Sequence, residues 1–350
     1  MKRIYFTPIV LLFLIVSIQI GAQDKKLVPY SIAFYNLENL YDTINNNWKY
    51  DLEFSPRGSK KWDGKKYWSK VNNMAKVISL LAKETCPLGV AAIGVSEIEN
   101  RSVLEDLVKA DDLAGQNLSI VHYDSPDVRG VDVALLYNPL LFTVTSSHPY
   151  RLTLPNNPKF RTRDQLLVSG LLDGERFHII VNHWPSRRNG EKGSRSLRVA
   201  AAELCKHITD SIRAADPEAK VVIMGDLNDD PTNVSVRDVL NAKGNRKDVT
   251  PEGLFNPMMD FHNKGVGTLG YQGNWNVFDQ IIISGNMVGG DRTTFQFWKA
   301  EIFNRDFLLE QTGKYKGYPL RTFSGNTFLN GYSDHFPVLI YLVKYSPPTP

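Results

Sequence analysis

Short apolar segments alternate with amphipathic segments along most of the chain. Apolar runs of strand length occur at residues 31–35, 89–95, 131–137, 176–181, 221–224, 277–283 and 336–343. Between some of them, at residues 68–83, 103–108 and 197–212, apolar residues recur every three or four positions, as on a helix with one buried face. This pattern predicts two packed sheets flanked by helices, although it does not determine the order of the strands.

No internal repeat and no Gly/Ser-rich linker divides the chain, so we expect residues 23–350 to form one domain. Hydrophobic residues make up 42% of the chain and charged residues 22%, which excludes a disordered or fibrous protein. Two cysteines are too few for a disulfide-rich scaffold or a four-cysteine zinc site. Cys86 and Cys205 either form one disulfide or, as we favour, are two buried thiols.

The first 22 residues have the composition of a secretory signal peptide. Lys2 and Arg3 precede an apolar run at residues 9–20, and Gly21 and Ala22 follow it. The alternative is a membrane anchor, but the run is shorter than the roughly 20 residues that span a bilayer. We therefore expect residues 1–22 to be cleaved, no integral membrane segment to remain, and the mature protein to be extracytoplasmic, either periplasmic or secreted.

The net charge does not identify a partner. Because Lys2 and Arg3 leave with the signal peptide, the formal charge falls from +4 to +2. A nearly neutral protein lacks the cationic excess that tight duplex binding depends on, although a nuclease that binds transiently does not need one.

Polar residues cluster at or beside the ends of several predicted strands. Each alone is more often a turn residue, a helix cap or a core histidine. Together they indicate one site, because rigid strands can bring side chains to a common edge of a sheet. These residues are Asn36, Glu38, Glu97, Asn182, His183, Asp226, Asn228, Asp279, Asp334 and His335.

The chemistry of this set favours hydrolysis of a phosphate ester. Carboxylates and amides without cysteine suit Mg²⁺, Mn²⁺ or Ca²⁺ better than Zn²⁺. A hard divalent cation neutralises phosphoryl oxygens. One histidine can then activate water and the other can protonate the leaving oxygen, while a carboxylate sets the tautomer of the base.

Ordered motifs that contain these residues span nearly all of the predicted mature chain. They are FYNLEN at 34–39, VSEIEN at 95–100, RGVDVALLYNP at 129–139, VNHWPSR at 181–187, MGDLNDDP at 224–231, FDQIIIS at 278–284 and SDHFPV at 333–338. In these motifs the chain resembles the endonuclease/exonuclease/phosphatase superfamily of deoxyribonuclease-like, metal-dependent phosphodiesterases. The NxEN and NHWPSR variants are similar to a secreted bacterial branch usually described as endonucleases.

The resemblance implies a four-layered α/β sandwich, with two packed, mainly antiparallel mixed sheets flanked by helices and the site at one edge of the sheets. It implies Mg²⁺ as cofactor, with Mn²⁺ or Ca²⁺ as alternatives. Carried over by motif, Glu97 is the main metal ligand, Asn36 and Glu38 lie in the metal and phosphate shell, and Asp334 adds charge nearby. Glu38 stands where many relatives carry Asp.

The same resemblance assigns catalytic roles. His335 corresponds to the general base and Asp279 to the carboxylate that orients it. His183 resembles the general acid of the deoxyribonuclease branch, while Asp226 and Asn228 position the attacking water and the phosphate. Arg129 and Arg187 are candidate substrate contacts, and the alternative for each is a solvated loop arginine.

Two further segments have unusual composition. Residues 45–70 interleave aromatic and cationic side chains, which suits flexible nucleic acid or a membrane surface. The interpretation that we favour is a long loop with its own small core and solvated lysines. Residues 292–330 are also rich in aromatic side chains, and we expect them to shape the substrate cleft.

The leading hypothesis is a secreted, divalent-metal-dependent endonuclease that hydrolyses nucleic-acid phosphodiester bonds by His-activated water attack. The alternative within the superfamily is a sphingomyelinase-like enzyme or a phosphatase acting on sugar or lipid phosphates. A non-catalytic binding protein on the same scaffold is less favoured, because the expected acid, base and metal residues are all present. Nucleic acid is the expected substrate, and nothing in the sequence implies an obligate protein partner.

Overall fold

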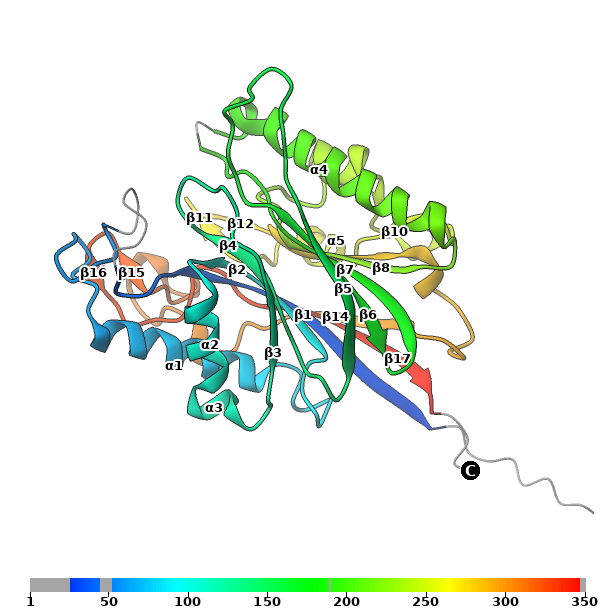
Figure 1. Cartoon of the computed structure of the whole chain (residues 1–350), viewed down its shortest axis with the longest axis horizontal. Coiled ribbons are helices and arrows are strands. Elements are labelled where there is room, and N and C mark those ends of the chain that lie inside the picture. Colours follow the sequence, from blue (N-terminus) through cyan, green and yellow to red (C-terminus); the bar gives the residue numbers. More distant parts are fainter. Residues whose placement is uncertain (1–25, 45–51, 189, 347–350) are drawn as a thin grey trace, which may run out of the picture.

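A computed structural model of the chain describes residues 26–44, 52–188 and 190–346 (Figure 1). The expected signal peptide, residues 1–22, lies outside the described residues, as do Trp48 and Tyr50. Among the described residues, no helix is long and apolar enough to cross a membrane.

One sheet has six strands in the order β14-β17-β1-β2-β4-β3. Strands β1 and β2 are parallel, and the other neighbours are antiparallel. The strands are β1 (Leu27–Leu40), β2 (Ala92–Ile98), β3 (Ser119–His122), β4 (Asp132–Tyr137), β14 (Gln296–Ile302) and β17 (Val338–Tyr345).

A second sheet has seven strands in the order β5-β6-β7-β8-β13-β10-β9. Strand β7 is parallel to β8 and β9 is parallel to β10, whereas the other neighbours are antiparallel. The strands are β5 (Phe142–Tyr150), β6 (Gln165–Leu172), β7 (Glu175–His183), β8 (Lys220–Asp226), β9 (Ala242–Lys243), β10 (Leu254–Phe255) and β13 (Asp279–Ser284).

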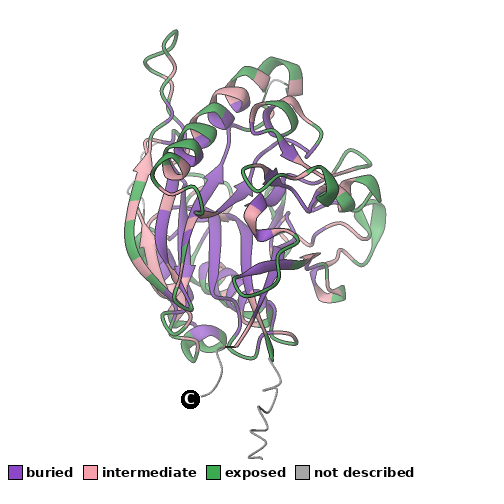
Figure 2. Ribbon diagram, turned by 90° about the vertical axis from the view of Figure 1, so that its right-hand side faces the viewer, coloured by how far each residue is buried: buried purple, intermediate pink, exposed green. Residues whose placement is uncertain are grey.

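Helices cover the outer face of each sheet. On the six-stranded sheet lie α1 (Gly64–Leu80), α2 (Arg101–Lys109) and α3 (Asp111–Ala114), and on the seven-stranded sheet lies α4 (Gly190–Ala215) (Figure 1). The face of α4 that contains Ala201, Cys205 and Ile208 packs on the second sheet, as its helical period predicts. Figure 2 shows buried strands between helices whose outer faces are exposed. This arrangement confirms the predicted four-layered sandwich.

Shorter elements lie in the connections. These are helix α5 (Met259–Asn263), the π-helical turn η1 (Ser235–Val239), and the 3₁₀ turns η2 (Arg246–Asp248), η3 (Gly285–Met287), η4 (Asp306–Leu308) and η5 (Gly313–Tyr315). Two hairpins, β11–β12 (Leu269–Tyr271 and Asn274–Asn276) and β15–β16 (Phe323–Ser324 and Thr327–Phe328), lie in the left-hand half of the molecule in Figure 1.

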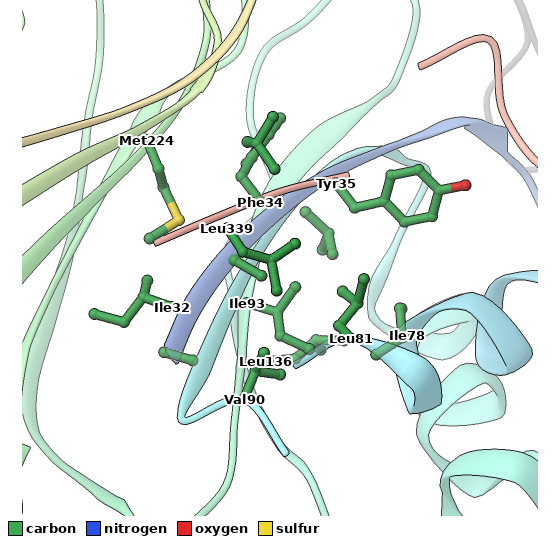
Figure 3. Close-up of a cluster of buried hydrophobic side chains, with 14 of the residues drawn as sticks. Ile32, Phe34, Tyr35, Ile78, Leu81, Val90, Ile93, Leu136, Met224 and Leu339 are labelled. Carbon is green, nitrogen blue, oxygen red and sulfur yellow. The ribbon is translucent and has the colours of Figure 1, made fainter. Parts of the chain in front are cut away.

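The two sheets meet through a continuous apolar core, part of which is drawn in Figure 3. Gly94 on β2 faces this interface. A Cβ atom at Gly94 would lie 2.5 Å from the sulfur of Met224 and 3.1 Å from carbons of Phe34 and Val181. The missing side chain therefore allows the sheets to approach closely at this point.

Several strands extend further than the apolar pattern predicts. The polar residues expected to follow β1, β2, β7 and β8 mostly lie in the last residues of these strands. In β1 and β2 the pairing register shifts near these ends, and Glu38 and Glu97 have positive φ angles of 48° and 61°. Such irregularities change the direction of side chains without ending the sheet. The polar residues therefore lie within the strands, although the sequence pattern placed them after the strand ends.

The loop after β1 has its own aromatic core, as we favoured. Trp62 is buried, its indole N–H donates to the backbone oxygen of Tyr41, and its ring packs on Phe54 and Phe323. Lys70 at the end of this stretch is buried, so the expectation that its lysines are solvated was wrong for this residue. Cys86 and Cys205 are two free, buried thiols, so the disulfide alternative was wrong.

Candidate active site

The predicted site residues come from both sheets and meet at one end of the sandwich. Strands β1 and β2 bring Asn36 and Glu97, strands β7, β8 and β13 bring His183, Asp226 and Asp279, and the turn before β17 brings His335. Four of these six residues line a cavity of about 850 Å³, whereas Asn36 and Asp279 are buried and do not line it. Its lining includes Glu97, Arg129, His183, Arg187, Asp226, Asn228, Phe278 and His335.

His335 is held by a buried carboxylate. Its Nδ1 lies 2.7 Å from Oδ2 of Asp279, which leaves Nε2 directed toward Asp226, whose Oδ2 is 3.9 Å away. The backbone N–H of His335 donates to Ser333, and the Ser333 hydroxyl donates to the backbone oxygen of Asn36. The ring is therefore fixed from both sheets, with its tautomer set by Asp279.

Asp226 lies at the centre of the cluster. Its Oδ2 accepts a hydrogen bond of 3.1 Å from the Asn36 amide and lies 3.6 Å from Nε2 of His183, while its Oδ1 accepts from the backbone N–H of Asn228. Burial raises the pKa of Asp226 to about 6. The structure thus brings together Asn36, His183, Asp226 and His335, as the motifs predicted.

Glu97 carries a firmly negative carboxylate. Burial alone would raise its pKa, but Arg129, 3.1 Å away, and His183, 3.8 Å away, lower the pKa to about 2. Its other oxygen accepts a hydrogen bond from the backbone N–H of Asn39. Arg129 is partly exposed and lines the cavity, so it can contact Glu97 and a bound anion together.

The two histidines have opposite electrostatic environments. Burial, followed by the charge of Arg163, lowers the pKa of His183 well below its ordinary value. Burial also acts to lower the pKa of His335, but Asp279 and Asp334 raise it well above that value. Positive charge bound among the same carboxylates would oppose the rise at His335.

Sequence reasoning missed Arg163. Its guanidinium donates to the backbone oxygens of His183 and Trp184 and pairs with Asp127 at 3.1 Å. It holds the end of β7 in place behind the predicted acid. A buried arginine of this kind has no local sequence signal, because its partners are distant in the chain.

Glu38 and Asp334 belong to a neighbouring ion-pair cluster. Oε2 of Glu38 accepts from the backbone N–H of Thr322 at 2.7 Å and lies 3.9 Å from Lys70. Its Oε1 lies 3.5 Å from Arg321, which also pairs with Asp334. Burial raises the pKa of Glu38 to about 7. Its predicted role in the metal shell stays a prediction, and the sequence reasoning did not find its partners Lys70 and Arg321.

Arg187 and Asn228 are tied together at the cavity wall. Nε of Arg187 donates to the backbone oxygen of Asn228, and the Asn228 amide donates to the backbone oxygen of Trp184. Arg187 also pairs with Asp229 and Asp230. Both residues line the cavity, but much of the donor capacity of Arg187 is used inside the protein.

The donor set fits a hard divalent cation. One carboxylate oxygen of Glu97, from the six-stranded sheet, and one of Asp226, from the seven-stranded sheet, lie near Nε2 of His183. Glu97 and Asp226 both line the cavity. Asp226, Asp279 and His335 also each offer one ligand atom within 4.8 Å of the others. Within the described residues, Oδ1 of Asp279 is buried without a hydrogen-bond partner. Such oxygen-rich sites suit Mg²⁺, Mn²⁺ or Ca²⁺.

Comparison with known proteins identifies the family of the chain. A sequence model of the Endonuclease/Exonuclease/phosphatase family matches residues 31–344. A search of curated proteins gave no match.

Solved structures with low sequence identity share the fold. An endonuclease/exonuclease/phosphatase family protein from Bacteroides thetaiotaomicron is 17% identical, with a TM-score of 0.56 over 91% of this chain and 96% of that one. A mannosyl-6-phosphatase from the same organism is 16% identical, with a TM-score of 0.55 over 89% and 99%. TDP2 from D. rerio, complexed with single strand DNA product, is 13% identical, with a TM-score of 0.53 over 90% and 98%.

Proposed function

Because the chain belongs to the endonuclease/exonuclease/phosphatase family, whose members are metal-dependent phosphoric ester hydrolases, we propose that it is an endonuclease acting on nucleic acid. The observation that carries this proposal is the pair of histidines that flank Asp226 at 3.6 and 3.9 Å on the floor of one cavity. Two imidazoles on either side of a carboxylate can serve the two proton transfers of phosphodiester hydrolysis.

Each residue has a distinct part in the proposed reaction. Asp279 orients His335, so that Nε2 removes the proton of the attacking water. His183 donates a proton to the leaving oxygen; because burial and Arg163 lower its pKa, it must take up that proton when the anionic substrate binds beside it. Asp226 and Asn228 orient the water and the phosphate, and Arg129 contacts the phosphate. A divalent cation bound at Glu97 would neutralise the phosphoryl charge.

The size of the cavity and the three arginines along it support a polymeric substrate. The cavity of about 850 Å³ is lined by Arg129, Arg187 and Arg188, and a second cavity adjoins it. The structural neighbour from D. rerio was complexed with single strand DNA product, which is compatible with this choice. The alternative is a phosphatase acting on sugar or lipid phosphates, or a sphingomyelinase-like enzyme. The mannosyl-6-phosphatase among the structural neighbours is compatible with the phosphatase alternative.

A substrate panel tests the proposal. The purified protein is assayed with plasmid DNA, RNA, sphingomyelin and mannose 6-phosphate, each with Mg²⁺, Mn²⁺ or Ca²⁺. We expect nicking of plasmid DNA that is absent in His335→Ala, which controls for a contaminating nuclease. Hydrolysis of mannose 6-phosphate or sphingomyelin without DNA cleavage would assign the protein to the alternative.

We also propose that the protein is exported and that residues 1–22 are removed. The basic start and short apolar run support this proposal. Mass spectrometry of the protein from the periplasm and medium of expressing cells should find a mature amino terminus directly after Ala22. An intact Met1 on the protein would contradict it.

A further inference from the structure

A second cavity, of about 380 Å³, lies beside the active-site cavity. Tyr271 and Gln272, at the tip of the β11–β12 hairpin, line both cavities. His335 lines the first cavity and its chain neighbour Asp334 lines the second. The second cavity therefore begins within one residue of the proposed base.

Two tyrosine rings at this cavity are unusually exposed. Tyr271 on the hairpin is 62% exposed and Tyr315 in η5 is 50% exposed, although both line the cavity. Exposed aromatic rings that line a cavity beside a catalytic site are candidate ligand contacts, because they gain most by being covered.

Tyr318 fixes the position of the hairpin relative to the segment that carries Tyr315. Its hydroxyl accepts a hydrogen bond from the backbone N–H of Gly273, and its ring packs on Trp275 with centroids 5.1 Å apart. A Cβ atom at Gly270 would lie 2.6 Å from the same ring, so the strand backbone lies directly against it. The cavity is therefore formed by packed contacts between the hairpin and the segment that carries Tyr315.

We propose that this cavity is a nucleobase subsite, in which Tyr271 and Tyr315 stack on the base next to the scissile phosphate. This inference rests on the proposed nuclease function. Stacking on exposed aromatic rings accepts any base, because every base has a flat face. Arg321, which also lines the cavity, is paired with Asp334 and Glu38, so the subsite depends on stacking and not on a free positive charge.

The experiment uses single-stranded oligonucleotides with one phosphodiester bond, all other linkages being methylphosphonates. One version is complete, and two others replace the base on the 5′ or the 3′ side of that bond with tetrahydrofuran, which keeps the sugar and phosphate. Cleavage of each is measured for the native protein, Tyr271→Ala and Tyr315→Ala, with the metal that supports the highest rate.

We expect removal of the base on one side to lower kcat/KM of the native protein about tenfold. Tyr271→Ala and Tyr315→Ala should each lower kcat/KM on the complete oligonucleotide by a similar factor. In neither variant should absence of the same base lower kcat/KM further, because the tyrosine substitution and the missing base each remove the same stacking contact. The matched control is Tyr123→Ala, which removes a 40% exposed ring that lines neither cavity and should leave kcat/KM unchanged.

Three outcomes would overturn the subsite: unchanged kcat/KM in both tyrosine variants, equal cleavage of all three oligonucleotides, or losses that multiply in full when variant and abasic substrate are combined. If the native protein cleaves none of the oligonucleotides with Mg²⁺, Mn²⁺ or Ca²⁺, the proposed nuclease function fails and the subsite fails with it. Thermal melting of each variant verifies that the fold is intact.

Discussion

The floor and the wall of the site are built in different ways. The floor, which we define as Glu97, His183, Asp226, Asp279 and His335, consists of side chains on strands of both sheets and in the turn before β17. Glu97, Asp226, Asp279 and His335 are each hydrogen-bonded to a residue of another element, mostly in a buried position. The imidazole of His183 lies 3.6 Å from Asp226 and 3.8 Å from Glu97. This part of the molecule resists change in geometry, because its strands are paired on both sides.

The wall, which we define as Tyr271, Tyr315 and Arg321, stands on a two-stranded hairpin and irregular segments, and its side chains are largely exposed. Loops on a rigid scaffold tolerate substitution and carry differences in recognition. We therefore expect substitutions in the floor to change the rate of the chemical step and substitutions in the wall to change substrate preference.

The largest expected effect is at the base. His335→Ala should lower kcat by about 10³-fold, because the proton acceptor for water is lost. Asp279→Asn keeps the imidazole but removes the charge that orients it, and should lower kcat less. Single-turnover cleavage of a short oligonucleotide measures both. Activity close to that of the native protein in His335→Ala would show that the floor does not carry the chemistry.

The junction between floor and wall depends on Lys70. Its ammonium is buried, donates to the Thr322 hydroxyl at 2.7 Å and to the backbone oxygen of Tyr332, and lies 3.9 Å from Glu38. Lys70→Met should lower the free energy of unfolding by about 3 kcal/mol, because it leaves these buried groups without their cation.

Urea denaturation measures this loss. The double variant Lys70→Met/Glu38→Gln should recover part of the stability, because it no longer buries a carboxylate beside an apolar side chain. If Lys70→Met unfolds at the same urea concentration as the native protein, the buried ammonium does not stabilise the junction.

The floor should also control metal affinity. Glu97→Gln removes a cavity carboxylate that Arg129 keeps ionised and should weaken Mn²⁺ binding by more than about tenfold, as measured by calorimetry. Glu191→Gln is the matched control, because Glu191 also lines the cavity but pairs with Arg195. Equal affinities in both variants and the native protein would place the metal elsewhere.

The smallest of these effects concerns the spacing of the two sheets beneath the floor. Gly94→Ala should lower the free energy of unfolding by about 1–2 kcal/mol, because the added methyl group meets Met224 at 2.5 Å. Gly115→Ala is the control, since a Cβ atom there has no neighbour within 4 Å. Thermal or urea unfolding compares the two, and equal stability would mean that the sheets can separate slightly without loss.

Much of the fold and part of the site could be predicted from local pattern. The alternation of apolar runs with helical periods predicted the layers, and the SDH motif with Asp279 predicted the pair that the structure places at 2.7 Å. Of the strands in the two large sheets, β3, β5, β6, β9, β10 and β14 were missed. Strand β5 shows the reason: its exposed positions carry polar residues, so it lacks a continuous apolar run.

The sequence by itself determined which chemical groups this protein has, their order along the chain, and the strands and helices that carry them, because hydrophobic periodicity and short motifs are local properties. Only the tertiary structure decided which charges meet. Asn36 and Asp226 are 190 residues apart, and Glu38 and Thr322 are 284 residues apart. Contacts of this range depend on how two sheets pack and where a late segment folds back, which no local pattern records.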